Sequence, residues 1–405
     1  MKLWKQKRLY MDYAAATPLH KRVARLMVLL QKINYANPSS IHKEGRIARE
    51  LLEATRLRLA RLLVVQPQEV FFTASGTEGN NLAIEGYLRA QLAKGKKMSD
   101  LAVITTPLEH PSITEVLKGL VEEGLEVRQL DIDKEGKVMI PSLEKALDEK
   151  AVLLAIHYAN SEIGVVQNIK KISKTIRHYN QKNTQTVKIL LDACQAPLWL
   201  PCQVPSLGVD VMTLDAGKCN GPKGVGILVK KSDVELLAII QGGGQESGLR
   251  AGTENLIGIV GAVEAIVLAQ ESYRERSEKV RRVSKVLWEE IEREIPEAVF
   301  NGPAITADDR VPNNVHISLL GYDTEFTVVE LDEGGVAAST KSACSGAGGG
   351  ESTVVLAISG DAARAKSTLR FTLDPTLTAR HIRHVAKLLR KHIDKMKPYS
   401  NTRLS

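Results

Sequence analysis

The sequence predicts an α/β protein: a mostly parallel sheet covered by helices on both faces, followed by a smaller α+β domain. Two observations in the first two thirds of the chain predict the sheet. Its apolar runs are continuous rather than alternating, and amphipathic helical patterns lie between most of them. The last third of the chain has few strands and groups its helices, which predicts the second domain.

The predicted sheet strands are short apolar runs, at residues 69–74, 101–106, 151–158, 187–193, 209–214 and 224–229. Helical patterns between them include residues 39–63 and 168–179. A long, highly charged amphipathic pattern from about 253 to 293 predicts one helix that leaves this domain. In the last third, we expect strands at 313–320, 335–340 and 366–373, a helix over 324–333 and a final helix near 376–397.

Composition places the chain among ordinary globular proteins. It has 405 residues, 43% hydrophobic and 25% charged, which is enough for a large core and two domains. No run approaches the roughly 20 apolar residues that a membrane helix needs. The basic N-terminus lacks the apolar segment of a secretory signal, so we expect a cytoplasmic location and no membrane association.

Charge and cysteine content limit the partners and cofactors. The net charge of +8 fits a solvated basic surface or an acidic partner, and no RNA-binding motif favours direct nucleic-acid binding. The four cysteines are Cys194, Cys202, Cys219 and Cys344. None forms a CxxC pair and no close Cys/His pair has metal-ligand spacing, so we expect free thiols and no metal site.

Two strand ends are followed by polar residues that suit ligand binding. Ser75-Gly76-Thr77 opens a helix after the first predicted strand, where backbone N–H groups and a hydroxyl can bind a phosphate; a simple helix cap is the alternative. His110 lies between a strand and a helix that begins at Pro111. It sits at the carboxyl edge of the sheet, where α/β proteins bind ligands, or it caps the helix.

The stretch 190–197, LLDACQAP, places Asp192 at the end of a very apolar strand. A carboxylate there is costly unless it meets a cation or strong donors. It is either a structural cap or the partner of a protonated heterocyclic nitrogen.

Lys218 and Lys223 compete for the role of a reactive amine in the stretch DAGKCNGPKG. Lys218 follows the strand 209–214 at the same sheet edge, and a partly buried lysine can act as a nucleophile that forms a Schiff base. Lys223 sits in a turn, so Lys218 is preferred. Cys219 beside it is expected to be a packing residue.

Cys344 begins a loop rich in glycine and serine, SACSGAGGGES. Such a composition favours a mobile loop. The cysteine is therefore either a reactive thiol or a half-buried residue without a role.

Taken in order, these segments resemble the cysteine desulfurases of the NifS/IscS type, within the class V aminotransferases. The resemblance covers roughly residues 10–372 and rests on YMDYAAATP, NPSSIHKEGR, FFTASGTEGNNLAIEG, LEHPSI, HYANSEIGVVQ, LLDACQAP, DAGKCNGPKGVG, GGGQESGLRAGTEN, SACSGAG and STLRFTL. It implies the fold type I of pyridoxal 5'-phosphate (PLP) enzymes. The implied domains are a large one with a mostly parallel seven-stranded sheet (18–262) and a small one (1–17 and 263–405) that carries the cysteine loop.

The resemblance also implies which residues hold PLP. Lys218 matches the lysine that carries the cofactor as a covalent aldimine, His110 the histidine that stacks on its ring, and Asp192 the aspartate that pairs with the ring nitrogen. The other matched cofactor residues are Gln195 at the phenolic oxygen, Gly76 and Thr77 at the phosphate, and Thr253, which reaches the phosphate of a second subunit and so implies a homodimer.

The same resemblance implies a reaction. Asn160 and Arg370 match groups near the substrate carboxylate, which a planar guanidinium binds well. Cys344 matches the nucleophile that takes sulfur from L-cysteine as a persulfide and leaves L-alanine. Its loop looks like that of the enzymes that feed iron–sulfur assembly or tRNA thiolation, which implies a sulfur-acceptor protein as partner.

At two positions the chain departs from the family. The usual pattern around the lysine is S-x-H-K, and both the Ser and the His help to hold the phosphate; here the positions are Asp215 and Gly217. We expect either weaker PLP binding or an Asp215 that turns away to pair with a neighbouring Arg or Lys. The alternatives to a desulfurase are a class V aminotransferase, a selenocysteine lyase, or a non-catalytic binding protein that kept the fold.

Overall fold

The structure is a computed structural model that describes residues 8–340 and 350–400. Its centre is a seven-stranded sheet in the order β2-β8-β7-β6-β5-β3-β4. The strands are β2 (Val70–Thr73), β3 (Ala102–Thr105), β4 (Glu126–Gln129), β5 (Ala151–His157), β6 (Lys188–Asp192), β7 (Val211–Asp215) and β8 (Gly226–Lys230). The six strand predictions and the α/β class are confirmed. Only β8 runs antiparallel to its neighbours, and the partly exposed edge strand β4 is additional.

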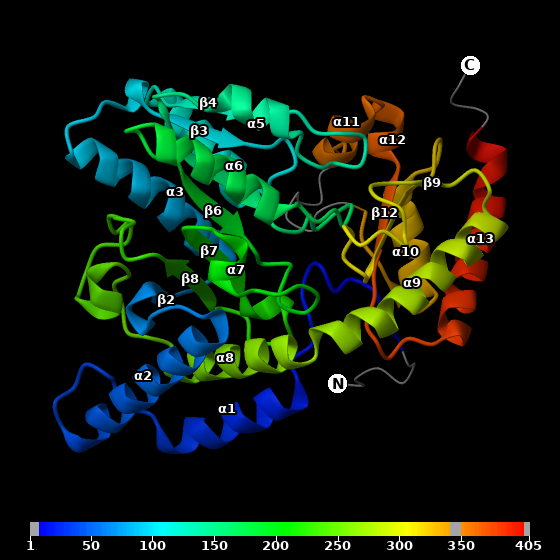
Figure 1. The fold of residues 1–405 in the computed structure, drawn as a ribbon. Helices are drawn as coiled ribbons and strands as arrows, with labels where there is room; N and C mark the ends of the chain where they lie inside the picture. Colours follow the sequence, from blue (N-terminus) through cyan, green and yellow to red (C-terminus); the bar gives the residue numbers. More distant parts are fainter. Residues whose placement is uncertain (1–7, 341–349, 401–405) are drawn as a thin grey trace.

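Helices cover both faces of this sheet (Figure 1). They are α1 (Lys21–Ile33), α2 (Lys43–Leu63), α3 (Gly76–Ala93), α4 (Pro111–Glu122), α5 (Ile140–Ala146), α6 (Ile169–Lys182), α7 (Val204–Leu207) and α8 (Leu256–Glu271). Successive residues of β6 belong to different clusters: Leu190 packs with α3 and α4, whereas Ile189 and Leu191 pack with α2, α6 and α8. This alternation is why the strands read as continuously apolar.

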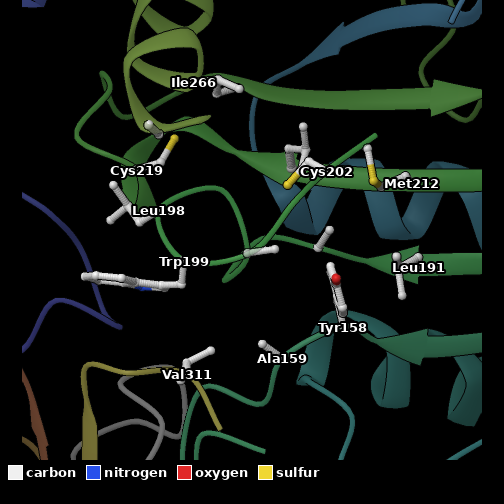
Figure 2. Packing of buried hydrophobic residues seen from close by; sticks show 14 of the residues in the cluster. Tyr158, Ala159, Leu191, Leu198, Trp199, Cys202, Met212, Cys219, Ile266 and Val311 are labelled. Atoms are coloured by element: carbon white, nitrogen blue, oxygen red, sulfur yellow. The ribbon is translucent and has the colours of Figure 1, made fainter. Parts of the chain in front are cut away.

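Buried thiols contribute to the larger of these clusters. Figure 2 shows Cys202 and Cys219 among apolar side chains such as Leu198, Trp199 and Ile266. Both cysteines are fully buried and unpaired. Cys219 is therefore a packing residue, as the sequence predicts.

The prediction of one helix over 253–293 is wrong. Two helices occupy the region, α8 and α9 (Tyr273–Glu294), and they meet at Ser272 with a bend of 71°. Each helix has its own packing partners: α8 lies against α1 and α2, and α9 lies against α13 (Ala379–Ser400). Within the described residues, only this bent pair taken together reaches the length and apolar content of a membrane span, and no single helix does.

The remaining chain builds a smaller α+β layer. Strand β10 (Asn314–Ser318) lies between β12 (Thr368–Thr372) and β9 (Val299–Phe300), antiparallel to both. The other elements are α10 (Thr324–Glu333), α11 (Thr353–Ser359) and α12 (Ala362–Lys366). The predicted strand at 335–340 is only β11 (Val336–Ala337), which pairs with the N-terminal β1 (Leu9–Tyr10). Strand β1 thus joins the smaller layer, which is otherwise built from the last third of the chain.

Four short 3₁₀ helices complete the described chain: η1 (Pro67–Glu69), η2 (Met98–Asp100), η3 (Ala216–Lys218) and η4 (Gln245–Gly248). The register of the sheet sets the position of the site. His157 lies opposite Asp192, and Asp192 lies opposite Thr213, so β5, β6 and β7 end at the same edge. Helix η3 directly follows β7 and places Lys218 at that edge.

Candidate active site

A cavity of about 500 Å³ lies at the carboxyl edge of β5, β6 and β7. Many of the residues that the sequence singled out line it: Gly76, Thr77, His110, Asn160, Asp192, Gln195 and Lys218. They come from five separate segments of the chain, and the sheet topology brings them together. Open α/β sheets bind ligands at this edge.

Asp192 is a buried carboxylate with strong donors. Its Oδ1 accepts the backbone N–H of Cys194 at 3.0 Å and its Oδ2 accepts the side-chain amide of Asn80 at 2.8 Å. Burial alone raises the pKa of this carboxyl, but the Cys194 amide, the Lys218 charge and Asn80 outweigh burial and hold the pKa below its ordinary value. Asp192 is therefore ionised at neutral pH and faces a cavity that can receive a cation.

Lys218 lines the cavity and Lys223 does not. Lys218 is half-buried at the end of η3, and its ammonium makes no hydrogen bond or ion pair with the part of the chain that the structure describes. Lys223 instead donates to the carbonyl of Thr17, which fixes the turn behind the site. Of the two lysines, Lys218 is the one whose amine is available to a ligand in the cavity.

His110 both caps a helix and lines the cavity, so the two alternatives for it are compatible. Its Nδ1 accepts the backbone N–H of Ser112 at 3.1 Å as the N-cap of α4. Burial lowers the pKa of His110 and the nearby Lys218 charge lowers it further, against the opposing effect of Asp192 and Asp215. The imidazole is thus neutral at pH 7, with its proton on Nε2.

Helix α3 begins at the cavity with a cap that leaves Thr77 available. The hydroxyl of Ser75, not that of Thr77, accepts the N–H of Glu78 at 3.1 Å. Gly76 has no room for a side chain, because a Cβ would lie 2.3 Å from the Cys194 sulfur. The first turn therefore presents the backbone of Gly76 and the side chain of Thr77 to the cavity.

Among the residues that the structure describes, Asp215 pairs with no Arg or Lys, so the expectation of a neighbouring cation is wrong there. Its Oδ1 accepts the N–H of Gly217 at 2.8 Å and its Oδ2 accepts the N–H of Gly76 at 3.3 Å. No ion pair joins Asp215 to a cation in residues 8–340 or 350–396. The carboxylate instead bridges the end of β7 and the first turn of α3, inside the cavity wall.

Gln195 and Asn160 line the cavity with partly committed side chains. The Gln195 amide nitrogen donates to the carbonyl of Ala14 at 2.9 Å, which leaves its carbonyl end for other partners. Asn160 donates to Leu108 and accepts the N–H groups of Glu162 and Ile163, so it also shapes the turn after β5.

Arg370 and Thr253 lie outside the cavity lining. Arg370 is fully buried and donates to the Asp12 carboxylate at 2.8 Å and to the carbonyl of Ser161, a lining residue, at 3.1 Å. Thr253 is exposed and lies near the first turn of α3. Arg250, three residues earlier, connects this segment to that turn by donating to Glu78. Roles for both residues remain predictions.

Cys344 lies outside the described residues. The chain on either side of that segment is close to the site: Ser339 pairs with the backbone of Arg370, and Thr353 and Val354 line the cavity. Ser352, the cap of α11, donates to Glu162 in the cavity wall at 2.6 Å.

Sequence reasoning missed two polar groups behind the site. Asn80, on the buried face of α3, connects Asp192 to Ser112 and to Thr213. In the cavity wall, a hydrogen bond of 2.8 Å joins the buried Glu109 carboxyl to Nδ1 of His157. Asn80 lies within FFTASGTEGNNLAIEG and Glu109 within LEHPSI, but the sequence pattern gives neither of them a role; Asn80 inside an otherwise apolar helix face was the available signal.

The residues in the cavity fit the ring of PLP. An ionised buried carboxylate suits a protonated ring nitrogen, an unengaged amine suits an aldehyde, and a neutral imidazole suits a ring face. The phosphate end differs, because Asp215 accepts the Gly76 amide. Asp192, Lys218 and His110 therefore fit the ring of the cofactor, whereas Asp215 places a carboxylate where its phosphate would bind.

Comparisons with known proteins agree with this arrangement. The sequence profile named Aminotransferase class-V matches residues 9–385. A cysteine desulfurase IscS of Dictyoglomus turgidum is 35% identical, with 98% of this chain and 97% of the relative covered. A solved NifS-like protein has a TM-score of 0.87 at 30% identity and covers 96% of this chain and 100% of its own. A structure described as SspA in complex with cysteine has a TM-score of 0.75 at 29% identity, covering 92% of this chain and 100% of its own.

These matches extend over nearly the whole chain, and the cavity contains the expected lysine, aspartate and histidine. The protein belongs to the class V aminotransferase family of PLP-dependent enzymes.

Proposed function

We propose that the protein is a cysteine desulfurase, which converts L-cysteine to L-alanine and keeps the sulfur as a persulfide on Cys344. The observation that carries the proposal is the meeting of Lys218, His110 and Asp192 in one cavity. The names of the relatives give the substrate class: several are cysteine desulfurases, and one structural relative was solved with cysteine.

When bound, PLP supplies an electron sink that stabilises negative charge on the substrate. Asp192 maintains this sink, because its ionised carboxylate stabilises positive charge at the ring nitrogen. Lys218 would anchor the cofactor and would move protons at Nζ; its half-buried amine, which has no partner among the described residues, suits both roles. His110 keeps its proton on Nε2 because Nδ1 is occupied by the Ser112 amide.

Sulfur transfer needs a thiolate on Cys344. The Cys344 sulfur attacks the sulfur of the substrate and forms an S–S bond, while the C–S bond of the substrate breaks. The Cβ atom then gains a proton and becomes the methyl group of alanine. Cys344 loses one proton and the substrate Cβ gains one. The electron pair of the broken C–S bond stays on Cβ, so the reaction consumes no external oxidant or reductant. The bond from Ser352 to Glu162 supports this proposal, because it holds the described chain eight residues after Cys344 at the cavity wall.

Arg370 and Asn160 are proposed to orient the substrate carboxylate. Arg370 touches the cavity wall through Ser161, and its Nε is buried without a partner among the described residues. A guanidinium N–H that lacks a partner and lies close to the wall suits a substrate carboxylate as acceptor.

The finer assignments are also proposals: a homodimer, a cytoplasmic location and a sulfur-acceptor protein that serves iron–sulfur assembly or tRNA thiolation. The exposed Thr253 supports the dimer: it does not line the cavity of its own chain, so it is available to the site of a second subunit. Exposed Val28, Leu29 and Ile33 on α1 form apolar surface that a second subunit can cover. The proposed domain division is 18–262 against 1–17 with 263–405.

The experiment is incubation of PLP-reconstituted protein with L-cysteine, followed by alanine quantification and mass mapping of Cys344. We expect alanine and a peptide one sulfur atom heavier at Cys344. C344A should keep the absorbance of bound PLP but lose alanine formation. Full sulfide production by C344A with a reductant would contradict the proposal. Comparison of L-cysteine with L-selenocysteine separates a desulfurase from a selenocysteine lyase.

A further inference from the structure

The first turn of α3 already holds an anion that belongs to the chain itself. The Asp215 carboxylate accepts the N–H of Gly217 with one oxygen and the N–H of Gly76 with the other, at 2.8 and 3.3 Å. Gly76 and Gly217 are buried, and all three residues belong to the rim formed by β7, η3 and α3. The carboxylate thus uses a backbone donor at the helix end that would otherwise be available to a bound phosphate.

This position matters because a helix N-terminus binds anions through its unpaired N–H groups and its dipole. A carboxylate and a phosphate at the same helix end share these donors and repel each other. The repulsion is strong in a partly buried site, where water screens charges poorly. An incoming phosphate must therefore displace Asp215 or bind beside its charge.

Gly217 and Asp215 depend on each other sterically. A Cβ on residue 217 would lie 3.2 Å from Asp215 Oδ1, closer than an ordinary van der Waals contact. Gly217 does not have a positive φ, so its backbone accepts any residue and the restriction comes from the carboxylate. A side chain at 217 therefore needs either a shift of the hydrogen-bonded Asp215 carboxylate or a smaller residue at 215.

We propose that Asp215 and Gly217 reduce the selectivity of this site for the phosphate group of its cofactor. The Asp215 carboxylate already occupies the anion-binding N–H group of Gly76 at the start of α3, so the phosphate group of a ligand adds little affinity. The site therefore binds the unphosphorylated aldehyde pyridoxal nearly as well as PLP. The inference rests on the proposed cofactor site at Lys218, because both aldehydes need that amine.

The test measures the dissociation constants of PLP and pyridoxal with purified apoprotein, by absorbance titration of the Lys218 adduct. For the unchanged chain we expect pyridoxal to bind within about tenfold of PLP. The double variant D215S/G217H removes the charge and supplies a hydroxyl and an imidazole. Charge-assisted hydrogen bonds should then tighten PLP binding by about tenfold or more and leave pyridoxal binding unchanged.

Two single variants and a surface control make the result specific. D215S should give part of the gain, whereas G217H alone should give none, because its side chain meets the Asp215 carboxylate. D100S changes an exposed aspartate and should leave both constants unchanged. Thermal melting of each apoprotein checks that the variants fold.

Two outcomes overturn different claims. If the unchanged chain prefers PLP over pyridoxal by about 1000-fold, or if D215S/G217H leaves that ratio unaltered, the role of Asp215 is refuted while the cofactor site stands. If neither aldehyde forms an adduct and K218A behaves like the unchanged chain, the proposed function itself fails.

Discussion

The side-chain amide of Asn80 lies 2.8 Å from the Asp192 carboxylate and donates to it in the interior of the protein. The same nitrogen donates to the Ser112 hydroxyl, and the Asn80 oxygen accepts the Thr213 hydroxyl at 2.6 Å. One asparagine on α3 thereby connects α4, β6 and β7 behind the cavity. Asp192, which is predicted to contact the cofactor ring, is thus held in place by a residue to which the sequence pattern assigns no role.

Replacement of Asn80 by alanine should weaken both folding and cofactor binding. Asp192 loses a donor, so its pKa rises, and the Thr213 hydroxyl loses its acceptor. We expect the free energy of unfolding to fall by about 1–3 kcal/mol, with a weaker affinity for PLP. Chemical denaturation and absorbance titration measure these effects. N183A, which removes an exposed amide that bonds to Tyr179, serves as control and should change neither quantity strongly.

Gly76→Ala should disturb the first turn of α3 through a specific collision. The new methyl would lie 2.3 Å from the Cys194 sulfur, whereas its next neighbour, the Asp215 Cβ, is at an ordinary 3.5 Å. G76A should therefore lower the melting temperature and weaken PLP binding. Adding C194A removes the colliding sulfur, so the double variant should recover most of the loss relative to C194A. Equal damage by G76A in both backgrounds would show that the collision is not the cause.

Much of this site could be read from the sequence because its residues follow apolar strands. Asp192 ends β6 and Lys218 follows β7, so the parallel sheet alone predicts that they meet. Asn80 could not be found that way, since it lies inside α3 and its partners come from three distant segments. Only the tertiary structure brings its donors and acceptors together.

The break at Ser272 shows a second limit. No Pro or Gly interrupts the helical pattern there, and the charged residues of α9 continue it. The two helices diverge because α8, which is apolar on all sides, is buried against α1 and α2, while α9 packs on α13. Similarly, the sequence offered two orientations for Asp215, and the N–H groups of Gly76 and Gly217 decide between them.

The buried ion pair between Arg56 and Glu246 should be a major contributor to stability. Two guanidinium nitrogens donate to the carboxylate at 2.8 Å, and Glu246 also accepts the backbone N–H of Phe72. E246A leaves the buried Arg56 guanidinium with the exposed carboxylate of Glu53 as its remaining ion-pair partner, so the cost should approach the roughly 3–5 kcal/mol typical of a broken buried pair. The denaturation midpoint should fall accordingly. E275A, which breaks the exposed pair with Lys279, is the matched control and should leave the denaturation midpoint almost unchanged, because water screens this pair.

His316 should make the protein less stable in mild acid. Burial lowers the pKa of this histidine well below its ordinary value of 6.5, and the charges of Arg370, Arg310 and Arg364 lower it further. The folded state keeps the imidazole neutral while the unfolded state takes up a proton below about pH 6.5. Stability therefore falls with decreasing pH in that window, by up to about 1.4 kcal/mol per pH unit from this group.

The measurement for His316 is the free energy of unfolding at pH 7.5 and 5.5. H316N removes the titrating ring and can still accept from Asn301, which now donates to Nδ1. The pH dependence of H316N should be flatter than that of the unchanged chain. H178N, at an exposed position, controls for the loss of an imidazole. An identical slope for H316N and the unchanged protein would refute the assignment.

The thiols should differ sharply in reactivity towards alkylating reagents. Cys194, Cys202 and Cys219 are buried, and burial raises the pKa of each thiol, to about 12 for Cys202. At pH 8 a thiol with that pKa has only about one thiolate in 10,000 molecules, and burial also blocks the reagent. Iodoacetamide should thus modify the folded protein only at Cys344, as mapped by mass spectrometry, and all four cysteines after denaturation. C344S should resist modification until it unfolds; rapid labelling of any buried thiol in folded C344S would mean that its shielding is incomplete.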